Sequence, residues 1–594
     1  MFRPVTVDEI AALRRRGCRS RDWRRVEVKE PFHPEHYRNV LFSGDVHLGT
    51  TDEYQLIDGI EYDSGISDAT IHNCEIGDEV LIDKVGVSIS NYKIGRYAVI
   101  RNVGRIACTE NASCGNGIVI DALDETGGIP IPIFERMSSQ LASLFVVFRR
   151  DRELFAALSD AVSREAAEMI SLAGYIGDET TIENVDTIEN VRVADHASIS
   201  GATSLRNGTV GLRATIGPNV IACDFIAQSD SVIENGVTLH KVLVGQGSHL
   251  RNGFTAHESM FFANCTMECG EAAALIAGPY STSMHKSTLL IGAMTSFFNA
   301  GSGSNQSNHL YKSGPMHWGS LGRGCKLGSD SYIMWPAQIG AFNMVSGRHY
   351  CHPDTSSFPF SYLIVDNGVS TLLPGVAIKS VGTFRDAMKW PKRDRRAKDG
   401  RIDNITTSIF NPFTCGLMMS AIKQLDTMEE SLDDGQDDVV LADVRIPSSA
   451  IGKGKDLYQS ALNFYWGEVA LDGSEHTGSK FGREAWTDLG GQVMPISVVT
   501  KVKEQILAGE RMQKIESTLR KAFDDYKMAE WNWVNACLDD VDIRDFAAVS
   551  DEAAESLKDK LLSDAEAELR LANPDVTPAE IAEAAVVKQI KRYF

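Results

Sequence analysis

The fold of this chain is decided by the stretch IGDEVLIDKVGVSISNYKIGRYAVIRNVGRI, residues 76–106, in which aliphatic residues recur every six positions. The same register returns in LGRGCKLGSDSYIMWPAQIGAFNMV, residues 321–345. A helix cannot satisfy a period of six, but three short strands joined by tight turns can, if they form a triangular coil of about 18 residues. The pattern therefore predicts a left-handed parallel β-helix built from hexapeptide repeats. Its inward residues are Ile76, Ile82, Ile94, Ile100, Ile106, Leu321, Leu327, Ile333, Ile339 and Val345.

The rest of the chain divides around these repeats. Residues 1–64 are expected to form an N-terminal helix and strands, and the repeats to run over residues 65–382. Within them, apolar residues of 134–172 return every three or four positions, which predicts an inserted helical segment. Residues 383–445 contain a basic segment and an acidic run that is typical of a solvated linker. The amphipathic pattern of residues 446–594 predicts an α-helical accessory region, so the fold class is mainly β with a C-terminal α-helical region.

Composition favours an acidic cytoplasmic protein. The 594 residues carry a formal net charge of -21, which argues against nucleic-acid binding because that needs a basic face. No run of 18 apolar residues and no signal peptide occurs, so neither a membrane span nor secretion is expected. The 11 cysteines lack a C-x-x-C pair and are expected to be reduced thiols. No tightly bound cofactor is expected. A metal could be held by the run HYCH, residues 349–352, or by His257 with Cys265 and Cys269, but no strong zinc spacing is present and no metal site is predicted.

Polar residues gather late in the repeats, where the fold does not require them. Eight of the 14 histidines lie between His240 and His352. A general base needs a pKa near neutrality, so His309 and His317 are catalytic candidates, with Lys312 meeting negative charge. The substrate-binding candidates are Ser304, Asn305, Asn308, Tyr311, Arg323, Lys326, Asp330, Arg348, His349, His257, His285 and Lys286.

Two further patterns each leave two interpretations open. Lys312, Asp330 and Arg348 are spaced 18 residues apart and would stack on one outer edge, as a surface ion-pair ladder or as a binding edge for an anionic group. A protruding loop in the coil of residues 301–318 would break that register. The basic stretch TFRDAMKWPKRDRRAKDGR, residues 383–401, is either a solvated face or a segment that reaches back over the last coils. In the second case it would hold a phosphate or a coenzyme A nucleotide through Lys389, Lys392 and Arg393.

Several segments carry a resemblance to a known family. The sequences GSNQSNHLYKSGPMHWG, RGCKLGSDSYIMWPAQIGAF and KWPKRDRR together resemble an uncharacterised bacterial family of left-handed β-helix proteins with a domain of unknown function. At the superfamily level the repeats are similar to those of hexapeptide acyltransferases. That resemblance implies a homotrimer with sites between subunits, a histidine general base and an acyl-CoA co-substrate. The catalytic domain of sugar nucleotidyltransferases that carry such repeats has no counterpart here.

These observations lead to three functional hypotheses. The first is a transferase acting on a small phosphorylated or nucleotide-linked sugar-like substrate, by acyl transfer from a coenzyme A thioester. The second is a phosphoryl or nucleotidyl transferase that uses the same cationic site. The third is a non-catalytic binding or scaffold protein. The expected partners are a small anionic substrate and further copies of this chain.

Overall fold

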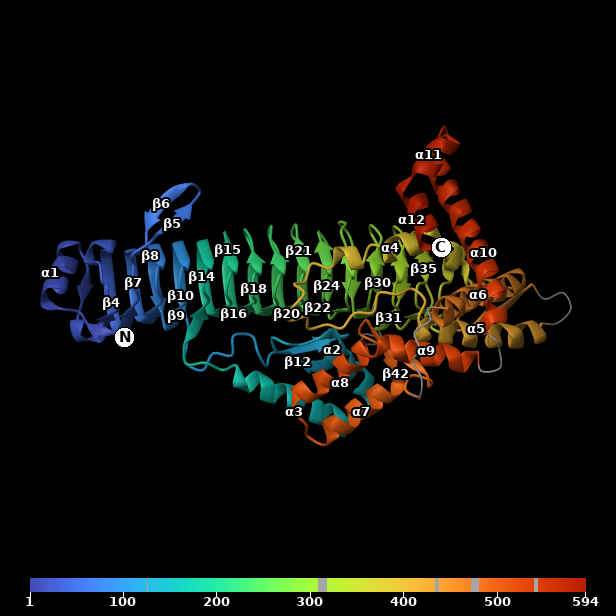
Figure 1. Cartoon of the computed structure of the whole chain (residues 1–594), viewed down its shortest axis with the longest axis horizontal. Helices are drawn as coiled ribbons and strands as arrows, with labels where there is room; N and C mark the ends of the chain where they lie inside the picture. Colours follow the sequence, from blue (N-terminus) through green and yellow to red (C-terminus); the bar gives the residue numbers. More distant parts are fainter. Residues whose placement is uncertain (125–126, 308–317, 433–436, 472–479, 539–542) are drawn as a thin grey trace.

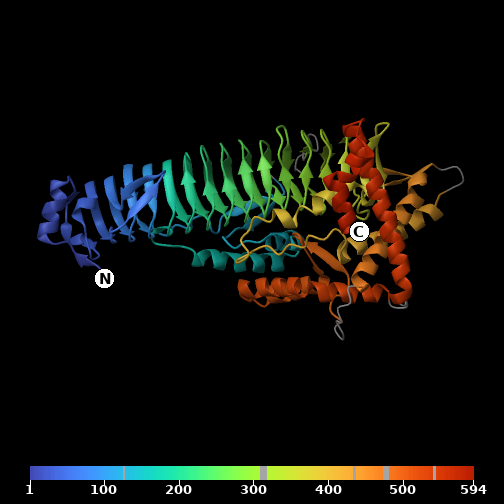
Figure 2. The ribbon, with the colours of Figure 1, turned by 45° about the horizontal axis from the view of Figure 1, so that its top comes forward.

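A parallel β-solenoid forms the long axis of the molecule in the computed structural model of the protein (Figure 1). The structure describes residues 1–124, 127–307, 318–432, 437–471, 480–538 and 543–594. Figures 1 and 2 both place the N-terminal helix at one end of the solenoid and several of the C-terminal helices at the other, while the helices of residues 496–524 lie alongside the middle of the solenoid. The prediction of a mainly β fold with a parallel solenoid and C-terminal helices is therefore confirmed.

Three walls of parallel strands make up the solenoid between residues 198 and 366. Wall A contains β15 (Ser198–Ser200), β17 (Thr215–Ile216), β19 (Val232–Ile233), β21 (His249–Arg251), β23 (Thr266–Glu268), β26 (Thr282–Ser283), β29 (Asn299–Ala300), β32 (Lys326–Leu327), β35 (Met344–Ser346) and β37 (Tyr362–Asp366). Four long strands cross from wall B to wall C: β16 (Ser204–Val210), β18 (Ile221–Ala227), β20 (Thr238–Val244) and β22 (Thr255–Phe261). Wall B continues through β24 (Glu271–Ala273), β27 (Leu289–Ile291), β30 (Asn305–Ser307), β33 (Tyr332–Met334) and β36 (Arg348–His349). Wall C continues through β25 (Ile276–Ala277), β28 (Ala293–Thr295), β31 (Gly319–Leu321) and β34 (Gln338–Ile339).

The parallel ladder begins well before residue 65. Strand β4 (Tyr37–Leu48) already pairs in parallel with β7 (Gly65–Ile76), and β2 (Arg19–Ser20) and β3 (Val26–Val28) pair in parallel with β4. The other N-terminal elements are β1 (Arg3–Pro4), α1 (Val7–Arg15), η1 (Trp23–Arg25), η2 (Pro34–His36), β8 (Leu81–Ser90), β9 (Tyr92–Ile94), β10 (Val99–Ala107), β13 (Gly174–Ile176) and β14 (Thr181–Val193). The hairpin of β5 (Tyr54–Ile57) and β6 (Ile60–Asp63) projects from this end of the solenoid (Figure 1).

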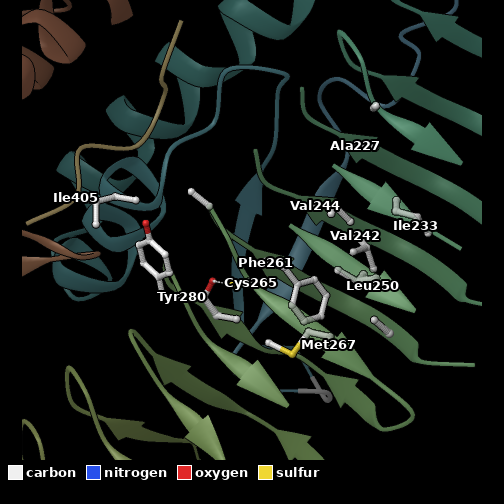
Figure 3. Close-up of a cluster of buried hydrophobic side chains, with 14 of the residues drawn as sticks. Ala227, Ile233, Val242, Val244, Leu250, Phe261, Cys265, Met267, Tyr280 and Ile405 are labelled. Atoms are coloured by element: carbon white, nitrogen blue, oxygen red, sulfur yellow. Dashed lines mark hydrogen bonds between the residues drawn. The ribbon is translucent and has the colours of Figure 1, made fainter. Parts of the chain in front are cut away.

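The six-residue register supplies the solenoid interior. Ile82, Ile100, Ile106, Ile333 and Val345 are fully buried. The other five members of the register are at most 4% exposed. In Figure 3, Val242, Leu250, Phe261 and Met267 lie in the interior between successive strands, which shows how the coils stack one apolar layer on the next. Apolar burial along this axis supplies the main driving force for the fold.

Coil length changes along the chain and marks two interruptions. Val99 pairs with Leu81, 18 residues earlier, and Thr181 pairs with Ser198, 17 residues later. Asn299 instead pairs with Lys326, 27 residues later, so this coil is longer than its neighbours.

The first interruption is the helical insertion. The chain leaves the ladder after β10 and rejoins it at β13, an excursion wider than the predicted residues 134–172. It contains the hairpin of β11 (Val119–Ala122) and β12 (Ile129–Pro132) as well as α2 (Ser139–Phe148) and α3 (Arg152–Glu168). The insertion packs on wall C through a shared apolar cluster that includes Leu141, Phe145, Ile226, Leu243, Met260 and Ile276.

The C-terminal region adds helices and two hairpins, partly at the far end of the solenoid and partly beside the insertion. Residues 412–430 form α5, so part of the predicted acidic linker is helical. The elements are β38 (Val369–Leu373), η4 (Val376–Lys379), α4 (Val381–Ala387), η5 (Pro391–Arg393), α5 (Pro412–Glu430), β39 (Asp438–Leu441), β40 (Val444–Pro447), α6 (Ser448–Leu471), β41 (Trp486–Leu489), β42 (Gln492–Pro495), α7 (Ile496–Leu507), α8 (Met512–Asp524), α9 (Tyr526–Cys537), α10 (Ile543–Ala572), α11 (Pro578–Glu583) and α12 (Ala585–Tyr593). Helices α7 and α8 join the insertion in its cluster against wall C.

Candidate functional site

Each coil passes from wall C to wall A through a residue in the left-handed backbone region, and we call this edge the corner. In the N-terminal coils the corner residues are mainly polar, for example Glu179, His196 and Arg213, with φ of 54°, 57° and 56°. In the C-terminal coils they are mainly aromatic: Tyr280, Phe297, Phe342 and Phe360, with φ of 59°, 51°, 57° and 55°. Bulky residues are rare at positive φ because of steric strain, so the aromatic corner needs compensation from its surroundings.

Packing between the rings supplies that compensation. Tyr280 stacks on Phe297 with a centroid distance of 5.6 Å, and Phe342 stacks on Phe360 at 4.7 Å. The corner residue between these two pairs is Gly324, where an added Cβ would lie 2.5 Å from the Phe342 ring. Trp390 packs beside this gap, 4.5 Å from Phe297 and 6.2 Å from Phe342. The aromatic corner thus forms the surface on which Trp390 and its neighbouring residues pack.

Residues 381–406, which we call the covering segment, run back along the corner from Trp390. Arg395 donates to the backbone oxygens of Asn264 and Cys265 at 2.9 Å each, and Ala397 N donates to the Asp230 carboxylate at 3.3 Å. Of the two interpretations left open for the basic stretch, the structure shows the one in which it reaches back over earlier coils. Figure 3 shows Ile405, near the end of this segment, beside Tyr280 at the corner.

A buried carboxylate ties the covering segment to the insertion. Asp403 accepts hydrogen bonds from Ser139 N at 2.7 Å and from Ala263 N at 2.9 Å. Burial raises the pKa of Asp403 above its ordinary value, while these backbone donors and nearby Arg396 oppose that rise. The segment is therefore held at both ends, by Trp390 and by Asp403, and its position against the coils is well defined.

Between the corner and the start of the covering segment lies a cleft of about 320 Å³. Its floor is aromatic, and its polar lining comes from two elements distant in sequence. The coils contribute Thr282, His285 and Lys326, and the covering segment contributes Arg385, Asp386, Lys389 and Arg393. A surplus of cations therefore faces one small space in a chain whose net charge is -21.

One carboxylate sits among three of these cations. Lys326 Nζ lies 2.5 Å from Asp386 Oδ2, and Arg385 and Lys389 approach Asp386 Oδ1 at 3.2 and 3.5 Å. Burial is the largest single influence and works to raise the pKa of Asp386. The charge and hydrogen bond of Lys326, together with the charges of Arg385 and Lys389, outweigh it, so the pKa lies below its ordinary value. Burial also lowers the pKa of Lys326. Arg393 has no ion-pair partner among the residues that the structure describes.

The structure brings four of the sequence-predicted residues to this cleft: His285, Lys326, Lys389 and Arg393. Lys286 is exposed and next to His285, but it does not line the cleft. Lys392 faces the other side of the covering segment and lines a different cavity. Five further candidates, Asn308, His309, Tyr311, Lys312 and His317, lie outside the described residues.

Two arginines that were predicted to bind substrate differ in their burial. Arg323 is buried; its guanidinium donates to Gly491 O at 3.3 Å and to Thr406 O, lies 3.4 Å from Asp488, and sits over the Phe297 ring. It joins the corner to the hairpin of β41 and β42. Arg348 instead forms an exposed ion pair with Asp330 at 2.7 Å. This pair matches the surface ion-pair interpretation of the predicted ladder.

The remaining candidates lie apart from the cleft. His349 is fully buried beside Ser370 Oγ at 2.9 Å, and burial lowers its pKa to about 4. Ser304 is buried and donates to Gly301 O at 2.7 Å, while Asn305 belongs to β30 on wall B. His257 lies in β22 on wall B, next to Glu258, which pairs with Lys241 at 2.7 Å. None of these four lines the cleft.

Sequence reasoning missed Arg385 and Asp386 and the aromatic floor. A usable signal existed, because Tyr280 and Phe297 are separated by 17 residues and Phe342 and Phe360 by 18, one coil in each case. Among the described residues, no group of three His, Cys, Asp or Glu side chains is placed to hold a metal ion, and no helix is long and apolar enough to cross a membrane.

Comparison with known proteins places the cleft in a family. Residues 2–429, which include every residue of the cleft, match the family described as "Domain of unknown function (DUF4954)". The chain belongs to this family. Residues 471–571 match a second domain of unknown function, DUF6819. Thus in this DUF4954 protein, helices α7 to α9 and most of α10 fall within the second match.

One relative was found in Treponema pallidum (strain Nichols), where it is described as an uncharacterized protein. It is 25% identical to this chain over 469 residues, covering 72% of the chain. The alignment spans 62% of that relative, less than two thirds of its length. This similarity assigns no activity to the chain.

Proposed function

We propose that this DUF4954 protein binds a small phosphorylated ligand in the cleft between the corner and the covering segment. The observation that carries the proposal is the convergence of Lys326, Arg385, Lys389 and Arg393 on one space that holds a single carboxylate, Asp386. Phosphate oxygens accept charge-assisted hydrogen bonds from Lys and Arg, and arginine can bind them with two parallel bonds. The cleft volume suits a phosphate group with a small organic body rather than a polymer.

The transferase hypothesis extends this binding proposal. His285 lines the cleft and is exposed, so it can take the proton of an acceptor hydroxyl or amine. The acceptor would attack the carbonyl of an acyl-CoA thioester, the C–S bond would break, and the thiolate would leave and receive the proton. The similarity of the repeats to those of hexapeptide acyltransferases supports this chemistry. A homotrimer and a cytoplasmic location belong to the same proposal.

A thermal-shift panel tests the binding proposal and separates the transfer hypotheses. A ligand that binds only the native state raises the melting temperature, by an amount that grows with the ratio of its concentration to Kd. We expect pyrophosphate to raise it, and acetyl-CoA to do so under acyl transfer or nucleoside triphosphates under nucleotidyl transfer. The Lys389→Glu/Arg393→Glu variant should lose the shift.

The matched control reverses two exposed cations that line no cavity described here, Lys398→Glu/Lys501→Glu. It changes net charge by the same amount and should keep the shift. If control and cleft variant lose the shift equally, the response reflects total charge and the binding proposal is wrong.

A further inference from the structure

A second cavity, of about 750 Å³, lies on the opposite side of the covering segment from the cleft. Residues 387–393 form a shared wall. Lys389, Trp390 and Arg393 line the cleft, whereas Met388, Pro391 and Lys392 line the second cavity. Neighbouring side chains of this short segment therefore line the cleft on one side and the second cavity on the other.

The second cavity is lined by residues from both of the regions that match a family. The DUF4954 region supplies Ala387, Met388, Pro391, Lys392 and residues 405–409, and the DUF6819 region supplies Phe523, Asp524, Tyr526 and Lys527 at the junction of α8 and α9. The last turn of α12 closes it with Gln589, Arg592 and Tyr593. A space of this size, assembled from three parts of the chain, falls in the range of small-molecule sites.

Its lining combines apolar walls with unpaired cations. The walls include Met388, Pro391, Ile405, Ile409 and Phe523. Lys392 and Arg592 are exposed, and neither has an ion-pair partner among the residues that the structure describes. Lys527 also lines the cavity but already pairs with Glu530 at 2.8 Å, and Asp524 is the one carboxylate in the lining.

We propose that this cavity binds an organic anion with an aliphatic body. Apolar side chains favour burial of the body in proportion to the surface that leaves water, and Lys392 and Arg592 receive the anionic group at the rim. A carboxylate and a phosphate monoester share this chemistry. The proposal concerns a site distinct from the cleft and does not depend on whether the cleft binds phosphate.

Titration calorimetry with simple amphiphiles tests the site directly. Hexanoate, octanoate and decanoate should bind the full chain with affinity rising up to about fourfold for each added methylene that is buried. Octanol, which lacks the charge, should bind at least about tenfold more weakly than octanoate. Octyl phosphate against octanoate then identifies the preferred anionic group, and either preference fits the site.

Two variants locate the binding. Lys392→Glu/Arg592→Glu alters exposed side chains only and should weaken octanoate at least about tenfold while leaving octanol unchanged. Thr407→Trp fills part of the cavity and should weaken all the amphiphiles, octanol included. The control Lys398→Glu/Lys501→Glu should match the wild type, and pyrophosphate binding should survive in Lys392→Glu/Arg592→Glu.

The proposal is overturned if affinity does not grow with chain length, or if octanol equals octanoate. It is also overturned if Lys392→Glu/Arg592→Glu binds octanoate as tightly as the wild type. Because pyrophosphate is measured on the same variants, failure here is distinguishable from failure of the phosphate cleft.

Discussion

The corner has the same left-handed backbone conformation in the N-terminal and the C-terminal coils. The two regions differ in the type of side chain at the corner and in how far it is exposed. Glu179 and His196 are exposed at positive φ and contact mainly each other, whereas Phe297 and Phe342 are buried at positive φ beneath Trp390. The solenoid interior therefore does not determine which side chains stand at the corner, and these side chains vary along the chain. In the described parts of the chain, the cationic cleft and Trp390 of the covering segment lie at the C-terminal corner.

Substitutions in the solenoid interior should cause the largest loss of stability. This loss should be similar in the N-terminal and the C-terminal coils. Ile199 and Ile333 are both fully buried. An unpaired carboxylate in an apolar wall costs several kcal/mol, so Ile199→Asp and Ile333→Asp should each unfold the solenoid to a similar degree. Circular dichroism melting measures this. A half that tolerates its substitution would show that the two interiors are not equivalent.

The corner should separate the two regions. Phe342→Gly relieves the backbone at positive φ but removes a buried ring, and it should destabilise the protein by about 3 kcal/mol or more. Glu179→Gly relieves the same backbone at an exposed site and should change stability by no more than about 1 kcal/mol. Urea denaturation of both variants measures the difference. Similar losses would mean that the aromatic corner adds nothing beyond the backbone.

Buried and exposed arginines give the next contrast. Arg323→Met leaves Asp488 and two carbonyls without their donor at a buried junction and should cost about 3 kcal/mol. Arg348→Met removes an exposed ion pair and should cost less than about 1 kcal/mol. Limited proteolysis should also show β41 and β42 released in Arg323→Met alone. Equal stability of the two variants would contradict a role for Arg323 in holding the C-terminal region.

The smallest effect is the pH dependence of stability that a buried histidine in the C-terminal coils produces. Burial lowers the pKa of His349 from 6.5 to about 4, so the unfolded chain binds a proton over that interval that the folded chain does not. Stability should therefore fall as the pH falls from 7 to 5.5, by about 1 kcal/mol from this group. His349→Gln should remove that part of the slope. An unchanged slope would show that the folded protein protonates His349 as readily as the unfolded chain does.

His249 should also make stability fall as the pH falls, and this contribution should persist in the His349→Gln variant. Burial, aided by Arg395, lowers its pKa to about 4. Because Arg395 belongs to the covering segment, protonation of His249 should weaken the contact between this segment and wall A.

The fold was predictable because its signal is repetitive. A six-residue aliphatic register repeated over many coils can only be satisfied by a solenoid, and each of its ten named residues is buried. The site was predictable only in part. Lys326, Lys389 and Arg393 stand out as cations in unusual places, but their partner Asp386 is an ordinary residue until the covering segment folds back onto the coils. That fold-back depends on Trp390 meeting Phe297 and Phe342, a contact between residues distant in sequence.

Arg323 and His349 show the opposite error. Both looked like binding residues because the solenoid wall does not need them. Arg323 instead meets a hairpin more than 160 residues away in sequence, and His349 turns inward beside Ser370. Polar density alone does not separate a ligand site from a buried junction within the protein, because both satisfy polar groups at one place.

Titration calorimetry of pyrophosphate on the full chain tests the central claim most directly, by comparing wild type with Lys389→Glu/Arg393→Glu and with the control Lys398→Glu/Lys501→Glu. If the cleft binds phosphate, pyrophosphate should bind wild type and control saturably, with an affinity that falls as salt increases, and should bind the cleft variant at least about tenfold more weakly. Equal affinity of all three proteins for pyrophosphate, or no binding to any of them, would contradict this claim.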